Sequence, residues 1–386
     1  MPAFVTTEPA LPTVGQPGIA AGEVVVYRRE PDDRAAHDHA TCSQIARRLA
    51  ALKGYTFAGE HDGDAASAIP RYVVPTSTIV GAGYARSLGI RTEHDLFGGV
   101  VPYPFVGTKS ITHPLVAPDA RAPDGWSAAF GRDVRRAVLD GFSAFSVDDA
   151  VRAGRDLLAR GPVRIKRALG VGGSGQVVVR DPRALKQALA DVDAAEIDGY
   201  GIALEQDLAD VTTYSVGQVR VDDLVATYCG TQSLTRNNHG ASVYGGSALL
   251  VARGDFDALL TLDHAPFARR AIAQARVYDE AALRCFPGLF ASRRNYDVAN
   301  GTDAHGRRCS GVLEQSWRVG GASGAEVEAL IAFRDDPALA AVHASTTEVY
   351  GDGATPPPDA IVYFQGTDAR AGPLLKFTSI EPHVHT

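Results

Sequence analysis

The chain has 386 residues, a hydrophobic fraction of 45% and a formal net charge of −7. This length suggests two or three domains, and the composition is ordinary for a soluble globular enzyme. The acidic balance argues against a nucleic-acid-binding protein, because such domains are usually strongly basic. No run of the sequence approaches the roughly 18 apolar residues that span a bilayer.

The N-terminal sequence and the spacing of the cysteines both predict a cytoplasmic location. The first residues, MPAFVTTEPA, lack the basic start and compact apolar segment of a signal peptide. The cysteines are widely spaced and contain no C-x-x-C, so we expect reduced thiols rather than a disulfide framework. They are Cys42, Cys229, Cys285 and Cys309. We therefore expect a cytoplasmic protein with no membrane or nucleic-acid partner.

The first hundred residues predict a small α/β unit after a loose leader, residues 1–23, that is rich in Pro, Gly and Thr. Apolar runs predict strands, and apolar residues at helical spacing predict helices. We expect strands at 23–28 and 71–76 and helices at 39–53 and 77–88. Thr41, or the preceding His37-Asp-His39, is expected to open the first of these helices. This capping role explains the two histidines better than a metal site does, because their spacing to Cys42 fits no standard zinc motif.

The middle of the chain has the clearest signals. A helix is predicted at 145–159, with Ser146 as its N-cap and acidic residues in its first turn. A strand containing Lys166, a glycine-rich turn and a valine-rich strand follow. A second helix is predicted at 182–191, with Asp181 as its cap and Pro182 at its first position.

Further along the chain, strands and helices continue to alternate without an internal repeat. We expect strands at 200–205, 213–219, 223–227, 295–298, 308–314 and 374–378, and helices at 255–260, 264–286 and 323–334. The strand pair 213–227 is expected to turn at Asp222-Asp223, and the pair 295–314 around a turn containing Asn300-Gly301. The fold class is therefore α/β in a mixed arrangement.

The glycine-rich turn at 170–175 has two competing interpretations. Its glycines satisfy G-x-G-x-x-G, the dinucleotide-binding pattern, which requires a helix after the turn. The segment QVVVR, 176–180, instead favours a strand. We interpret the turn as the tip of a hairpin that covers nucleotide phosphates. An ordinary glycine-rich hairpin is the alternative, and a nicotinamide oxidoreductase would require residues 176–180 to be helical.

Two carboxylates later in the chain suggest a metal site. Asp297 and Glu314 are expected on adjacent antiparallel strands, each beside an apolar neighbour. Mg²⁺ prefers one or two protein carboxylates together with phosphate oxygens and water. Arg318 follows four residues after Glu314, where its guanidinium could grip a phosphate or a carboxylate. Carboxylates on the face of a hairpin, paired with nearby arginines, are the alternative.

In these residues, taken in order, the chain resembles the ATP-grasp superfamily over about residues 100–335, and its overall sequence looks like an uncharacterised bacterial family of that group. The resemblance implies an ATP-grasp fold preceded by a small α/β domain. It also implies that ATP binds with Mg²⁺, or with Mn²⁺ as an alternative. The implied nucleotide-binding residues are Lys109, Lys166, Gly170, Gly172, Gly173, Ser174, Gly175, Glu205, Gln206, Asp207 and Leu208. The implied metal ligands are Asp297, Glu314 and Ser316, and the implied catalytic residues are Arg318, Arg236 and His239.

The chain also departs from the ATP-grasp pattern. Ser316 stands where the family usually has Asn, which puts a second Mg²⁺ in doubt. The carboxylate that often binds the ribose has no clear counterpart near Thr213, although Asp207 or Asp210 could replace it. Lys109 matches the upstream phosphate-binding lysine only loosely.

The resemblance implies five segments and a reaction. The segments are the leader 1–23, a pre-ATP-grasp domain 24–107, an N-terminal lobe 108–205, a C-terminal lobe 206–335 and a C-terminal extension 336–386. The implied reaction is an ATP-dependent ligation of a carboxylate to an amine, or to a thiol, through an acylphosphate. A kinase on the same fold and a non-catalytic nucleotide-binding protein are the alternatives. The implied partners are small-molecule carboxylate and amine substrates, and grasp ligases are often homodimers.

Overall fold

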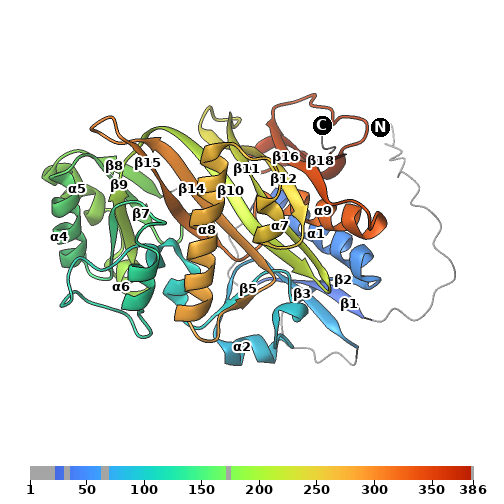
Figure 1. Cartoon of the computed structure of the whole chain (residues 1–386), viewed down its shortest axis with the longest axis horizontal. Helices are drawn as coiled ribbons and strands as arrows, with labels where there is room; N and C mark the ends of the chain where they lie inside the picture. Colours follow the sequence, from blue (N-terminus) through green and yellow to red (C-terminus); the bar gives the residue numbers. More distant parts are fainter. Residues whose placement is uncertain (1–21, 30–34, 62–68, 171–174, 384–386) are drawn as a thin grey trace.

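The computed structural model describes residues 22–29, 35–61, 69–170 and 175–383. In this part of the chain, four β-sheets and the helices that cover them form the molecule (Figure 1). The predicted leader lies almost entirely outside the described residues.

The N-terminal unit is a three-stranded parallel sheet covered by one long helix. Strand β1 lies between β2 and β3 and is parallel to both. Ile45 and Leu49 of α1 share a buried core with Val24 and Val26 of β1. Contrary to our expectation, no side chain in the described residues caps α1, because Ala35 occupies the N-cap position and the Thr41 hydroxyl donates to the carbonyl of His37. The elements are β1 (Glu23–Tyr27), α1 (Ala36–Lys53), β2 (Thr56–His61) and β3 (Arg71–Pro75).

A small three-stranded sheet joins this unit to the rest of the chain. Strand β5 pairs in parallel with β4 and antiparallel with β13, which comes from far along the sequence. The helix predicted at 77–88 is only partly correct, since its first part forms β4. The elements are β4 (Ile79–Val80), α2 (Ala82–Ser87), β5 (Gly99–Val101), α3 (Ala128–Asp133) and β13 (Phe290–Ala291).

The next sheet has four antiparallel strands in the order β6-β9-β7-β8. It forms one end of the molecule, with α4, α5 and α6 beside it (Figure 1). The N-caps predicted here are correct: Ser146 Oγ accepts from the amide of Asp149, and Asp181 Oδ1 accepts from the amides of Arg183 and Ala184. The elements are β6 (Gly141–Ala144), α4 (Val147–Leu158), β7 (Val163–Arg167), β8 (Gln176–Val179), α5 (Pro182–Ala190), α6 (Ala194–Tyr200) and β9 (Ile202–Gln206).

The segment after the glycine-rich turn is a strand, as predicted. Gln176 lies opposite Lys166 in the β7–β8 ladder. The glycines therefore precede a strand rather than a helix, and the condition for the dinucleotide-binding pattern is not met.

The largest sheet has eight strands in the order β15-β14-β10-β11-β12-β16-β18-β17, with antiparallel neighbours throughout. Helix α8 packs against β10, β11, β14 and β15, and α9 packs against β11, β12, β16 and β18. Along β11, Tyr228 belongs to the core beneath α9 and Cys229 to the core beneath α8. Because successive side chains of a strand point to opposite faces, the two helices cover opposite faces of this sheet.

The elements of this part are β10 (Ala209–Val221), β11 (Leu224–Arg236), β12 (Ser242–Arg253), α7 (Phe256–Leu260), α8 (Pro266–Cys285), β14 (Arg293–Thr302), β15 (Arg308–Ser316), α9 (Ser323–Asp335), β16 (Ala341–Tyr350), β17 (Ile361–Asp368) and β18 (Gly372–Pro382). Residues 336–386, which we assigned to an extension, thus supply three strands to this sheet. The division of the chain into domains remains a proposal.

Two turns of this sheet test the local predictions. The β10–β11 turn lies at Asp222-Asp223, as expected, with Asp222 at φ 50°. The predicted turn at Asn300-Gly301 is wrong, because both residues lie within β14. The chain reverses at 303–307, where Asp303 Oδ1 accepts from the amides of His305 and Arg307, both at 2.9 Å.

The described chain is therefore α/β. It has the order of elements expected for an ATP-grasp fold: a small α/β unit, a four-stranded antiparallel sheet with a glycine hairpin, and a larger antiparallel sheet. Across the described residues, every helix is too short or too polar to cross a bilayer.

Candidate functional site

A cavity of about 1550 Å³ is lined by residues of the four-stranded sheet and of the eight-stranded sheet. Ligand pockets usually measure about 300–1000 Å³, so this cavity has room for more than one small molecule. Most of the candidate residues line it. They are Lys109, Lys166, Gly170, Glu205, Gln206, Leu208, Asp297, Glu314, Ser316 and Arg318.

Lys166 on β7 forms a buried ion pair with Glu205 on the neighbouring strand β9. Their side chains are 3% and 1% exposed, and Lys166 Nζ lies 2.5 Å from Glu205 Oε1. His113 Nε2 lies 3.1 Å from the other carboxylate oxygen, Oε2. Burial acts to raise the pKa of Glu205, but Lys166 and His113 outweigh it, so the pKa lies below its usual value. Glu205 is therefore a buried anion that holds a lysine at the cavity wall.

Lys109 lines the same cavity, in a 3-10 helix, Lys109–Ile111, that the Thr108 hydroxyl caps. Its Nζ is 2.6 Å from Glu314 Oε2 and donates to the carbonyl of Gly170 at 2.9 Å. The Lys109 ammonium group thus joins Glu314 and Gly170, two other residues that the sequence predicted for the site. Lys109 is only 4% exposed, and a buried ammonium group needs hydrogen-bond acceptors such as these two oxygens.

Asp297 and Glu314 lie directly opposite each other on β14 and β15, as predicted. Asp297 Oδ1 accepts from Gln232 Nε2 at 2.8 Å and from Asn295 Nδ2 at 3.0 Å. Burial and the neighbouring Glu314 raise the pKa of Asp297 to about 6. Burial also acts to raise the pKa of Glu314. The positive charges of Lys109 and Lys166 lower it by more, so the pKa of Glu314 lies below its usual value. The two lysines and the two carboxylates line the same cavity.

This pair of carboxylates has the chemistry of an Mg²⁺ site that is completed by a ligand. Within the described ranges, no group of three or more His, Cys, Asp or Glu side chains could hold a metal ion. The donor set of two carboxylates fits an ion that takes its remaining ligands from phosphate oxygens and water.

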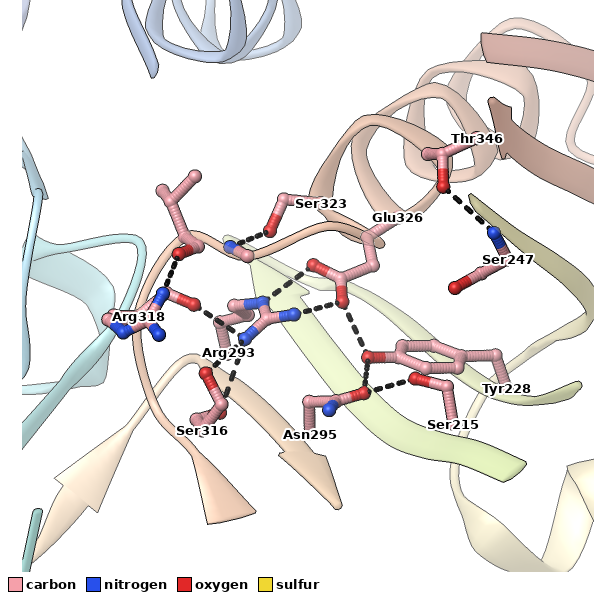
Figure 2. A network of polar contacts seen from close by, with 12 residues as sticks. Ser215, Tyr228, Ser247, Arg293, Asn295, Ser316, Arg318, Ser323, Glu326 and Thr346 are labelled. Carbon is pink, nitrogen blue, oxygen red and sulfur yellow. Dashed lines mark hydrogen bonds and ion pairs between the residues drawn. The ribbon is translucent and has the colours of Figure 1, made fainter. Parts of the chain in front are cut away.

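Ser316 and Arg318 lie on a segment that Arg293 holds in place (Figure 2). One guanidinium nitrogen, Nη1, donates to the Ser316 carbonyl at 3.2 Å, to the Ser316 hydroxyl at 3.3 Å and to the Arg318 carbonyl at 2.5 Å. Arg318 itself donates to the Val319 carbonyl at 2.8 Å. The Ser316 hydroxyl is thus already engaged by a cation, which makes it a poor ligand for a second metal ion.

The residues after Glu205 differ in their relation to the cavity. Gln206 and Leu208 line the cavity, whereas Asp207 forms an ion pair with Arg164 at 2.6 Å. Leu208 shares a small apolar cluster with Leu139 and Ala299. This cluster gives the cavity an apolar wall next to its charged groups.

Some predicted residues lie elsewhere. Arg236 and His239 are exposed at the tip of the β11–β12 hairpin, where Arg236 donates to the carbonyl of Gly240. The structure does not bring either residue to the cavity wall. Gly172, Gly173 and Ser174 lie outside the described residues, and Gly175, at φ +69°, directly precedes β8.

Sequence reasoning missed His113, Gln232 and the apolar residues Leu139 and Ala299. His113 lies in the segment 96–130, whose Gly and Pro content hides any period. Gln232 had one usable signal, its place on a long strand beside the polar loop 236–246. The apolar residues carry no signal that separates a cavity wall from a core.

Comparison with solved structures finds proteins of similar architecture at low identity. A biotin carboxylase from Campylobacter jejuni, solved with a β-γ-ATP complex, is 10% identical, with 93% of this chain and 87% of that chain covered and a TM-score of 0.48. An N5-carboxyaminoimidazole synthase from Aspergillus clavatus, solved with ADP and an aminoimidazole ribonucleotide, is 13% identical, with 94% of each chain covered and a TM-score of 0.48. A D-alanyl-alanine synthetase A from Vibrio cholerae is 10% identical, with 78% and 90% covered and a TM-score of 0.45.

No curated protein matches the chain. A family model described as "Protein of unknown function (DUF3182)" matches residues 24–378, which is most of the sequence. The chain therefore belongs to the DUF3182 family.

Proposed function

We propose that this protein is an ATP- and Mg²⁺-dependent cytoplasmic ligase that joins a carboxylate to an amine or a thiol. The observation that carries the proposal is one cavity wall that brings together two buried lysines and two facing carboxylates. Lys109 and Lys166 supply positive charge, and Asp297 and Glu314 supply metal ligands. This combination suits a polyphosphate bound together with its divalent cation.

The assignments follow from the position of each group. Lys109 and Lys166 would bind the phosphates, and the glycine hairpin would cover them with backbone N–H groups. The apolar wall at Leu139, Leu208 and Ala299 would receive the base. Asp297 and Glu314 would hold Mg²⁺, which when bound neutralises charge on the phosphates as a phosphoryl group leaves.

In the proposed reaction, a substrate carboxylate oxygen attacks the γ-phosphorus, and the bond to ADP breaks. The resulting acylphosphate is attacked at its carbonyl carbon by an amine or a thiol. Phosphate then leaves with the electrons of the carbon–oxygen bond, and the nucleophile loses a proton. The chain's contribution is to position these groups and to stabilise charge, which requires no protein nucleophile.

Ser316 supports a second candidate function, a nucleotide-binding protein without turnover. Its hydroxyl is held by Arg293, so the site would bind one divalent ion rather than two.

A phosphotransferase on the same fold would use the same charged groups. ADP release that needs both a carboxylate and an amine supports a ligase, whereas ADP release with one acceptor supports a phosphotransferase.

The first test is a thermal-shift panel of ATP, GTP and NAD⁺, each with and without Mg²⁺. Mass action predicts that a ligand that binds the folded state raises the melting temperature. We expect ATP with Mg²⁺ to give the largest rise, Glu314→Gln to abolish the Mg²⁺-dependent part, and the surface variant Glu280→Gln to retain it. Stabilisation by NAD⁺ alone would overturn the proposal.

A further inference from the structure

The two carboxylate oxygens of Asp297 have different surroundings. Both hydrogen bonds that the described residues donate to this side chain end on Oδ1, from Gln232 Nε2 at 2.8 Å and from Asn295 Nδ2 at 3.0 Å. All three residues line the cavity. An ionised carboxylate has roughly four lone-pair sites, two on each oxygen, and the two amide donors use those of Oδ1. The oxygen left for a cation is therefore Oδ2.

The register of the large sheet explains why these donors meet at Asp297. Asn295 lies two residues before Asp297 on β14, so both side chains point to the same face. Ser215 of β10 lies directly opposite Asp297, and Gly230 of β11 lies opposite Ser215. Gln232 follows Gly230 by two residues and therefore shares that face. The pairing of three strands thus fixes the backbone positions from which both amides reach the carboxylate.

Hydroxyl groups orient the amide of Asn295 (Figure 2). Ser215 Oγ donates to Asn295 Oδ1 at 2.6 Å, and the Tyr228 hydroxyl lies 2.9 Å from the same oxygen. Because an amide has one oxygen and one NH₂ group, these contacts turn Nδ2 toward Asp297. Gly217 leaves room for the Tyr228 hydroxyl, since a Cβ added there would overlap it.

The donors to Asp297 are neutral, unlike the partner of Glu314. Glu314 pairs with the Lys109 ammonium, a cation that competes with a metal ion for the carboxylate. The amides of Gln232 and Asn295 add no opposite charge and occupy one oxygen only. Asp297 can therefore keep both donors while Oδ2 binds a cation, and it then acts as a ligand with a single oxygen.

Divalent ions differ in how they use a carboxylate. Mg²⁺ demands near-octahedral geometry, keeps several waters and is bound through one or two carboxylates. Ca²⁺ is larger, takes about six to eight oxygen ligands and accepts both oxygens of one carboxylate. A carboxylate with one oxygen already occupied by amides therefore suits Mg²⁺ better than Ca²⁺.

We propose that Gln232 and Asn295 are specificity-determining residues that make the site select Mg²⁺ over Ca²⁺. They occupy Asp297 Oδ1 and so restrict this carboxylate to one ligand oxygen. The inference rests on the proposed binding of ATP with a divalent ion, and it adds the residues that choose the ion.

The test titrates Mg²⁺ or Ca²⁺ at a fixed ATP concentration and follows the melting temperature. Its readout is the ratio of the Ca²⁺ and Mg²⁺ concentrations that give half of the stabilisation. Gln232→Met keeps the length of the side chain and removes the amide. It should raise the Mg²⁺ concentration about 10–100-fold, the usual effect of losing a group that orients a metal ligand. The Ca²⁺ concentration should rise less, because the released Oδ1 offers Ca²⁺ a second oxygen, so the ratio falls.

A second variant and a control separate ion selection from stability. Asn295→Leu should lower the ratio as well, although it also lowers stability because the hydroxyls of Ser215 and Tyr228 lose an acceptor. The ratio compares two ions in the same variant, so that loss affects both measurements. The control Gln274→Met removes a glutamine that donates to the carbonyl of Ser310 at 2.9 Å, away from the cavity wall. It should keep the ratio of the natural protein.

Two results would overturn the inference: the natural protein responds equally to both ions, or Gln232→Met and Asn295→Leu weaken the responses to both ions by the same factor. No stabilisation by ATP with either ion would refute the proposed nucleotide site and this inference together. An unchanged ratio in variants that ATP with Mg²⁺ still stabilises would refute this inference alone.

Discussion

Asp297→Asn should stabilise the protein at high pH when no metal is present. Burial and Glu314 raise the pKa of Asp297 from 3.8 to about 6, so the folded protein holds this proton more tightly than the unfolded chain does. Stability therefore falls as the pH rises from about 4 to about 6, and it stays lower above that range. One pKa unit corresponds to about 1.4 kcal/mol, which gives a cost of at most about 3 kcal/mol at pH 8.

The substitution removes this cost without changing the size of the side chain. Its Oδ1 can still accept from Gln232 and Asn295, as Asp297 Oδ1 does. Urea unfolding in the presence of a chelator should show the variant to be more stable by up to about 3 kcal/mol at pH 8 and by less than about 1 kcal/mol at pH 4. An equal or lower stability at pH 8 would refute the reasoning.

Asp303→Asn is the control of opposite sign. Hydrogen bonds from the Arg307 amide and side chain lower the pKa of Asp303 to about 2. The charged carboxylate therefore stabilises the fold above the unfolded pKa, and this stabilisation is lost as the pH falls toward 2. The control should be less stable than the natural protein at neutral pH.

Two further predictions concern buried ion pairs. Glu326→Gln leaves the guanidinium of Arg293, which is 1% exposed, without its charged partner. Urea unfolding at pH 7 should show that the free energy of unfolding falls by about 3–5 kcal/mol. A fall of less than about 1 kcal/mol would contradict this account of the network. Lys166→Met leaves Glu205 buried with His113 as the remaining side-chain partner in the described part of the chain, and it should also destabilise the protein by several kcal/mol. The double variant Lys166→Met/Glu205→Gln should recover part of this loss. A double variant that is less stable than the single one would show that the pair does not behave as coupled charges.

Local sequence signals predicted those parts of the fold that local interactions determine. The caps of α4 and α5 depend on Ser146 and Asp181, whose side chains bind amides two or three residues away. The valines after the glycine turn predicted β8 for a similar reason. The pairing of Asp297 with Glu314 also followed from two adjacent apolar runs.

The incorrect turn shows where local signals fail. Asn-Gly is a strong hairpin signal, yet Asn300 and Gly301 continue β14. The reason is tertiary: β14 pairs with β10 on one side and with β15 on the other, and Asn300 lies opposite Thr212 and Ser310 in those ladders. Two sets of ladder hydrogen bonds outweigh the turn preference of one dipeptide.

The sequence predicted the main charged residues of the candidate site but not all of their partners. Lys166, Glu205 and Glu314 stand out because charged residues within apolar strands need partners. His113 could not be predicted as one such partner, since it lies about ninety residues before Glu205 and outside any recognisable element. The place of β18 in the large sheet was hidden for a different reason, because its pairing with β16 and β17 is a tertiary contact that no local signal marks.

The ion pairs of the cavity imply how a nucleotide would enter it. In the structure, Lys109 binds Glu314 and Lys166 binds Glu205, so each lysine is already neutralised by a carboxylate. A phosphate chain with Mg²⁺ supplies an alternative partner for both members of the Lys109–Glu314 pair, since an anionic oxygen replaces the carboxylate beside Lys109 and the cation replaces the lysine beside Glu314. Lys166 has three N–H donors, so it can donate to a phosphate oxygen and keep its contact with Glu205. Binding would therefore exchange buried charge pairs rather than create unpaired ones, which avoids the desolvation cost of an isolated buried ion. The same exchange explains why both components are needed: phosphate without a cation would draw Lys109 away from Glu314 and leave two facing carboxylates to repel each other.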